Sequence, residues 1–149
     1  MNIQLEVGYL EGFLKAIEIA AGRRARIAAN WYASNENPVD GLAAFFRERE
    51  IAFGGLEGSI VSREDFLSEV WKFSTDLMAG TSASVLKDIK WQFEEYLGLI
   101  SSNLGQDHPF HPLFHCQLYR VLIQGKPGEL VLLIQFEQAV VALFLETRA

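Results

Sequence analysis

Apolar and polar positions alternate at the start of the chain and then change to helical spacing. The apolar residues at positions 3, 5 and 7 are separated by polar ones, a pattern typical of a strand. From residue 10 to residue 21 the apolar side chains recur three or four positions apart, which indicates a helix. Gly22 breaks or weakens this helix before residues 23–33. We therefore predict a short strand or extended lead-in followed by helical segments.

Two later segments begin with residues that are favoured at helix starts. The side chain of Asn37 can accept a hydrogen bond from a free backbone amide, and Pro38 suits the first turn, so we predict a helix from here to Gly54. Ser62 is a similar capping residue, and the residues after it have the clearest helical spacing in the chain. We expect this second helix to end at Gly80.

A further helix start follows at Ser82 or Ser84. The apolar residues after it recur at helical spacing and form one stripe, which predicts a helix with one buried face. The stripe consists of Val85, Leu86, Ile89, Phe93, Tyr96, Leu97 and Ile100.

The last third of the chain changes to β-branched and aromatic runs. Residues 113–124, 129–136 and 139–146 predict three strands, with a turn at residues 125–128. Residues 130–134 are apolar at every position, so we expect helices or a second subunit to cover both faces of that strand. The expected fold class is α+β: four or five N-terminal helices, with or without a short first strand, packed on a C-terminal three-stranded antiparallel meander.

Composition limits the class of protein. With 149 residues, of which 50% are hydrophobic and 12% aromatic, the chain can form one globular domain over residues 1–149. The net charge of −6 argues against direct binding of nucleic acid, which requires a basic surface. An acidic domain can use such a charge for solubility alone or to attract a basic partner.

The cysteine count, the N-terminal residues and the apolar stretches indicate the cellular compartment. A single cysteine, Cys116, cannot form an internal disulfide, so a reducing cytosol is the expected location. The N-terminus lacks the basic and apolar regions of a signal peptide. Polar residues interrupt the most apolar stretch, residues 130–145, so we expect no membrane span and a cytoplasmic protein.

All three histidines and the cysteine lie in one short segment. Asp107, His108, His111 and His115 are residue types that bind metal or transfer protons. Their spacing matches no recognised zinc signature, and the two prolines in the segment prevent a regular helix that would align them. We interpret the segment as a proline-stiffened loop that enters a strand. The alternative is a metal- or histidine-dependent hydrolase that uses this cluster.

Other catalytic and cofactor motifs are absent from the sequence. The chain has no G-x-S-x-G, Walker, G-x-G-x-x-G or H-E-x-x-H motif. The glycine-rich residues 54–58 lack the Lys-Ser/Thr ending of a phosphate-binding loop, so we interpret them as a flexible connector. We therefore expect no cofactor and name no catalytic residue.

Trp91 lies opposite the apolar stripe of its helix. Lys87, Asp88, Glu94 and Glu95 share its outward face. A large aromatic side chain with a charged rim is typical of a protein-binding hot spot. The alternative is that another element, such as the N-terminal helix, covers Trp91 within the monomer.

Arg23, Arg24 and Arg26 form the one basic cluster. They either pair with Glu18 or Glu36 on a solvated helix or contact an anionic ligand.

Together these features favour a non-enzymatic domain that binds another protein through the Trp91 face. The expected partner is a basic protein, and the class that suits the charge is an inhibitor or immunity (antitoxin-like) protein that neutralises a basic toxin or nuclease by direct binding. Two alternatives remain: the hydrolase above, and a homodimeric structural subunit in which a second copy covers the free face of the C-terminal sheet.

Overall fold

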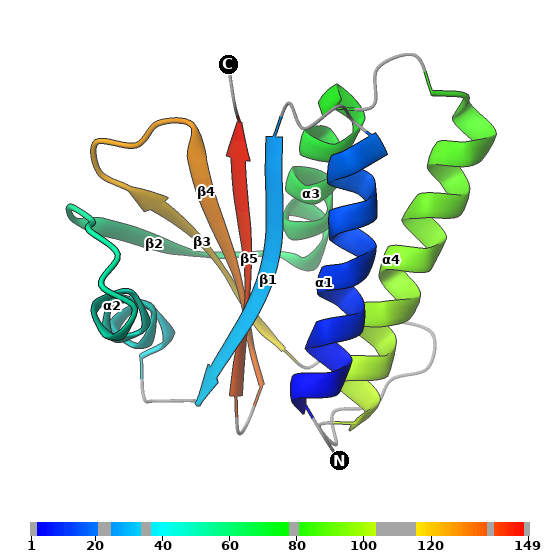
Figure 1. Ribbon diagram of the computed structural model, residues 1–149. Coiled ribbons are helices and arrows are strands. Elements are labelled where there is room, and N and C mark those ends of the chain that lie inside the picture. The colour runs from blue at the N-terminus through cyan, green and yellow to red at the C-terminus, as the bar shows by residue number, and fades with distance from the viewer. Residues whose placement is uncertain are drawn as a thin grey trace.

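Helices and strands alternate along the first half of the chain in the computed structural model, and three strands end it (Figure 1). The structure describes residues 3–20, 25–33, 37–77, 81–103, 116–136 and 139–147. In chain order the elements are α1 (Ile3–Ala20), β1 (Ala25–Ala33), α2 (Pro38–Glu48), β2 (Leu56–Val61), α3 (Arg63–Leu77), α4 (Ala83–Asn103), β3 (Gln117–Ile123), β4 (Glu129–Gln135) and β5 (Ala139–Thr147). The fold class is α+β.

The strands of the described ranges form one antiparallel sheet in the order β1-β5-β4-β3-β2. The prediction of a three-stranded meander is therefore wrong in its strand count. The three C-terminal strands do pair consecutively, but they are the centre of the sheet, and each of its edges is a strand from the N-terminal half. β1 pairs with β5 over nine residue pairs, and β2 pairs with β3 over six.

The strand β1 replaces the expected helical segment 23–33. Ile27 and Trp31 lie four residues apart, and residues at this spacing share a face in a helix and also in a strand. Pairing with β5 favours the strand over the helix, because in a strand Ile27, Ala29 and Trp31 point together into the core under the helices. The interpretation of residues 54–58 as a connector is also wrong from Leu56 onward, where β2 begins.

The apolar spacing of residues 3–7 is likewise compatible with either a strand or a helix. The predicted strand over residues 3–7 is the first turn of α1. Val7 is buried, but Leu5, two positions earlier, is 50% exposed, as expected for a helix and not for a strand with one buried face.

The predicted helix starts are confirmed by capping hydrogen bonds. The Asn37 side chain accepts from the backbone N–H groups of Val39 and Asp40, at 2.9 and 3.4 Å. Ser62 Oγ accepts from Asp65 N at 3.1 Å, and Ser82 Oγ accepts from Val85 N at 3.4 Å. These contacts satisfy amide groups that have no partner within a helix.

Helices cover both faces of the sheet. Figure 1 shows α1, α3 and α4 on one side and α2 on the other. In β4, Leu132 and Ile134 belong to the core cluster under the three helices, whereas Val131 and Leu133 belong to the cluster under α2. The prediction that this strand is covered on both faces is confirmed, and helices of the same chain provide the cover. No helix of the described ranges is long and apolar enough to cross a membrane.

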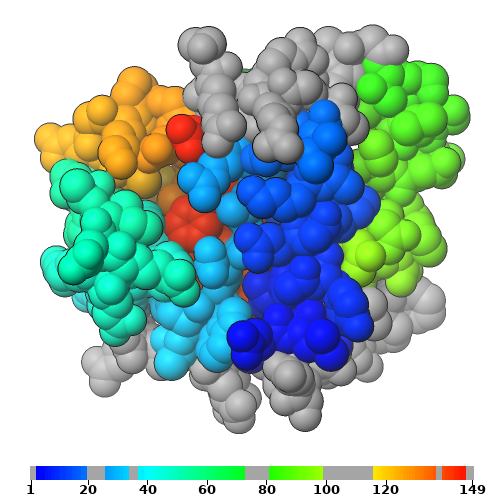
Figure 2. All heavy atoms as spheres, viewed as in Figure 1, coloured from blue at the N-terminus to red at the C-terminus, as the bar shows by residue number. Residues whose placement is uncertain are grey.

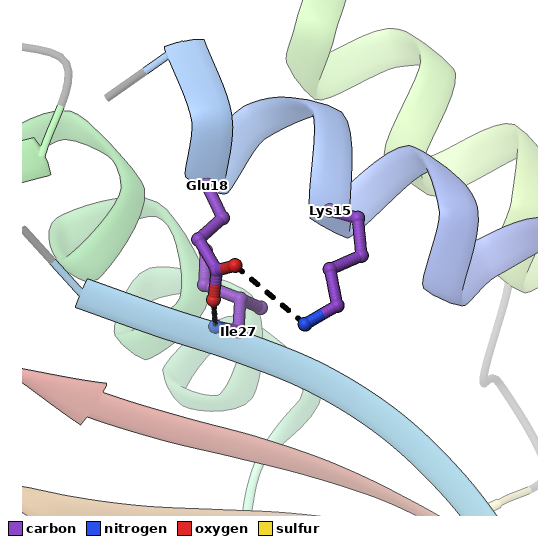
Figure 3. A network of polar contacts seen from close by, with 3 residues as sticks. All are labelled: Lys15, Glu18 and Ile27. Carbon is purple, nitrogen blue, oxygen red and sulfur yellow. Dashed lines mark hydrogen bonds and ion pairs between the residues drawn. The ribbon is translucent and has the colours of Figure 1, made fainter. Parts of the chain in front are cut away.

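A buried carboxylate connects α1 to the edge of the sheet (Figure 3). Glu18 is 3% exposed, and its Oε1 accepts a hydrogen bond from the backbone N–H of Ile27 at 3.2 Å. Lys15 Nζ lies 3.6 Å from Glu18 Oε2. Because β1 is an edge strand, this contact gives one of its amides a partner that the sheet itself does not supply.

The helix α2 is attached to the opposite face through Tyr32 of β1. The Tyr32 hydroxyl donates to the carbonyl oxygen of Pro38 at 2.7 Å, and its ring packs on Phe45 at 5.8 Å between centroids. Gly41 permits this approach, because a Cβ at that position would lie 2.7 Å from Tyr32 Cε2. Burial of the ring raises the pKa of Tyr32.

Candidate functional site

Two surface features of the described chain could bind a partner or ligand: the outer face of α4 and a pocket between α2 and the sheet. On α4, Phe93 and Leu97 are buried and point into the core. Trp91 lies on the opposite side of the helix and is 61% exposed. The helix α1 packs on a different side of α4, where the rings of Phe13 and Tyr96 lie 5.4 Å apart.

Trp91 differs from the other two tryptophans. Trp31 and Trp71 are partly buried and pack on the larger core cluster, and the Trp71 ring meets Phe93 edge to face at 5.4 Å. The alternative interpretation, in which another element of the monomer covers Trp91, does not agree with its exposure. The indole therefore remains accessible to a second molecule.

The charged residues expected around Trp91 lie one turn before and one turn after it on α4. Lys87, Asp88 and Glu95 are exposed and Glu94 is partly exposed. Within the part of the chain that the structure describes, none of these four forms an ion pair within 4.0 Å. They are thus free to pair with groups on a partner.

The predicted histidine cluster lies in the segment that precedes Cys116. Asp107, His108, His111 and His115 lie outside the described residues, so the hydrolase alternative stays a prediction. Cys116, which begins the next described segment, is partly buried and packs against the larger core cluster. Among described residues no group of three or more His, Cys, Asp or Glu side chains could hold a metal ion.

The pocket has a volume of about 270 Å³ and was not predicted from the sequence. Its walls are the C-terminal end of α2 with residues 51–53 on one side and β1 on the other, and β5 contributes to its floor. Figure 2 shows this hollow, with atoms of β5 in red visible between the two walls. No sequence motif signals it, because its residues come from segments that are far apart along the chain.

One residue of the predicted basic cluster reaches this pocket. Arg26 lies on β1 at the edge of the hollow, whereas Arg23 and Arg24 lie outside the described residues. The suggested pairing of the cluster with Glu18 does not occur for Arg26, because Glu18 instead contacts Lys15 and Ile27.

Comparisons of the chain with models of protein families, with characterised proteins and with solved structures give no match. The two surface features therefore provide the basis for a functional proposal.

Proposed function

We propose that this protein is a binding domain without catalytic activity and that the Trp91 face of α4 is its contact surface for another protein. The observation that carries the proposal is the 61% exposure of Trp91 in the middle of the outer face of a 21-residue helix. Burial of an indole removes a large apolar area from water at a small cost in side-chain entropy. An exposed tryptophan with a charged rim thus suits the centre of an interface.

Charge supports a basic partner. The chain has a net charge of −6, and the rim of the Trp91 face includes the carboxylates of Asp88, Glu94 and Glu95. Opposite charges on two proteins accelerate their encounter and disfavour acidic competitors. The specific form of the proposal is an inhibitor or immunity protein in the cytoplasm, whose partner is a basic toxin or nuclease that is blocked by direct binding.

The proposal is tested with three tagged baits expressed in cells that make this protein naturally: the unchanged chain, Trp91→Arg and Val85→Arg. Val85 is the matched control, because it is also an exposed apolar residue of α4, at 46%, but lies on another side of the helix. Proteins retained at moderate salt are identified by mass spectrometry, and the affinity of the purified candidate is then measured by calorimetry.

We expect the unchanged chain and Val85→Arg to retain the same basic protein in stoichiometric amount, released by high salt. Trp91→Arg should bind it at least about tenfold more weakly, which corresponds to a hot-spot loss of about 1.4 kcal/mol or more. All three chains should unfold within about 0.5 kcal/mol of one another, because both positions are exposed. Equal affinity of Trp91→Arg and the unchanged chain for the candidate would contradict the proposal.

A further inference from the structure

We propose that the pocket between α2 and the sheet binds a small organic anion with an aromatic or otherwise apolar body. This site is separate from the Trp91 face, because α2 and α4 lie on opposite sides of the sheet (Figure 1). The proposal depends on the aromatic lining of the pocket, on the cations at its edge and on its size.

The apolar part of the pocket includes four phenylalanine rings that already contact one another. Phe144 of β5 stacks on Phe45 with 5.9 Å between centroids, and Phe46 lies 6.0 Å from Phe144 and 5.3 Å from Phe53. All four rings line the pocket. Such a surface favours a planar apolar group, which can pack against the ring edges and the ring faces that Arg49 leaves uncovered.

Three cations lie at the edge of this aromatic surface: Arg26, Arg49 and Lys126. Lys126 is already engaged, because its Nζ donates to the carbonyl oxygen of Ala52 at 3.3 Å and lies 3.7 Å from Glu129 Oε2. Within the described residues, neither Arg26 nor Arg49 has a carboxylate within 4.0 Å. These two guanidinium groups, one on each wall, remain available to an anionic ligand.

Two carboxylates, Glu129 and Glu146, also line the pocket, and their negative charge opposes the binding of an anion. They lie directly opposite each other on β4 and β5, and Arg26 lies opposite Glu146 on β1. Glu129 therefore has Lys126 beside it, whereas Glu146 has Arg26 at the opposite register position but forms no ion pair with it among the described residues. Arg49 lies on the other wall and supplies the surplus positive charge, in a protein whose total charge is negative.

A cationic ligand is disfavoured, although aromatic pockets often bind cations. The Arg49 guanidinium carbon already lies over the Phe45 ring, 4.4 Å from its centroid, and Arg47 lies over Phe53 at 5.7 Å. Within the pocket, Arg49 thus occupies a face of the Phe45 ring that would attract a ligand cation, and its charge repels one. An anion gains from Arg49, because this side chain is held beside the apolar surface at which the ligand body would bind.

The volume restricts the size of the ligand. About 270 Å³ is just below the range of roughly 300–1,000 Å³ that is typical of pockets for drug-sized molecules. A body of one or two fused rings with a single acidic group suits this space, and the open side seen in Figure 2 allows it to enter without a change in the fold.

The test uses three probes that share one body and differ in charge: 2-naphthoate, the neutral 2-naphthamide and the cationic 2-(aminomethyl)naphthalene. Each is titrated into the ¹⁵N-labelled chain of 149 residues, and amide shifts are followed by NMR, which also shows whether each variant is folded. We expect saturable binding of 2-naphthoate with shifts in α2, β1 and β5. The amide and the amine should bind at least about tenfold more weakly, because they lose the charge-assisted hydrogen bonds.

Two neighbouring arginines of α2 and its C-cap provide a matched pair of variants. Arg49 lines the pocket and Arg47 does not, although each lies over a phenylalanine ring. Arg49→Gln should weaken 2-naphthoate binding about tenfold and leave 2-naphthamide unchanged, whereas Arg47→Gln should change neither. Arg26→Gln is an independent second variant with the same expected direction.

Three results would overturn the proposal. The first is that 2-naphthoate produces no saturable shifts in the pocket. The second is that the neutral or cationic probe binds as tightly as 2-naphthoate. The third is that 2-naphthoate binds the folded Arg49→Gln and Arg26→Gln variants as tightly as the unchanged protein.

Discussion

At the scale of single residues, Glu18 connects a helix to an edge strand through one hydrogen bond to Ile27 N. We expect Glu18→Ala to lower the free energy of unfolding by about 1–3 kcal/mol, because it leaves a buried amide without its acceptor. Glu18→Gln keeps a carbonyl oxygen and should cost less. Urea unfolding measures both variants. If the two substitutions cost the same, the ion pair with Lys15 and not the hydrogen bond would be the important contact.

Tyr32 provides a prediction with a pH dependence. Burial raises its pKa above the ordinary value of 10.0, so the folded protein keeps the phenol protonated at pH values where the unfolded chain releases the proton. The stabilisation by Tyr32 is therefore complete below about pH 10 and is lost as the pH rises above that value.

Below pH 10 we expect Tyr32→Phe to cost about 0.5–1.5 kcal/mol through loss of the hydrogen bond to Pro38. The difference between the two proteins should shrink as the pH is raised further, which denaturant unfolding at a series of pH values would show. A constant difference across pH 10 would contradict the proposed burial of the phenol.

At the scale of elements, the close approach of α2 to β1 depends on Gly41. Replacing a mid-helix glycine with alanine normally stabilises a helix by about 0.5–1 kcal/mol. At Gly41 the new Cβ would lie 2.7 Å from the Tyr32 ring, so we expect Gly41→Ala to lower the melting temperature instead. Gly12→Ala on α1 is the control, because nothing lies within 4 Å of its Cβ, and it should raise the melting temperature.

The helices and strands differ in how far local sequence determines them. The starts of α2, α3 and α4 depend on capping side chains within three residues of the amides they satisfy, so they could be predicted. β1 and β2 depend on partners 57 or more residues away along the chain. Their own residues are compatible with a helix or a connector, which explains why both strands were missed.

At the scale of the whole molecule, the sheet joins the two ends of the chain. β5 lies between β1 and β4, and Val140, Val141 and Ala142 in its middle are fully buried. We expect a chain that ends at residue 138 to lose both pairings and fail to fold, because β1 would then have no strand neighbour. Circular dichroism and NMR would show this. A cooperative unfolding transition in the truncated chain would contradict the expectation.

The two candidate sites, the Trp91 face and the pocket, also differ in how far local sequence determines them. The outward position of Trp91 follows from helical periodicity over about three turns, so the sequence alone indicated it. Its exposure depends on where α1 packs, which the sequence left open. The pocket joins Arg26, Phe45, Phe53 and Phe144, and no local pattern relates these positions. It exists only because β1 pairs with β5 in the folded chain.

The sequence by itself determined the features that depend on neighbouring residues: the helix starts, the outward position of Trp91, the three C-terminal strands and the apolar character of β4 on both faces. The tertiary structure decided the strand identity of β1 and β2, the placement of helices on both faces of the sheet, and the pocket. The physical reason is that capping and helical periodicity act within a few residues. Strand pairing and a binding pocket, in contrast, require groups that only the folded chain brings together.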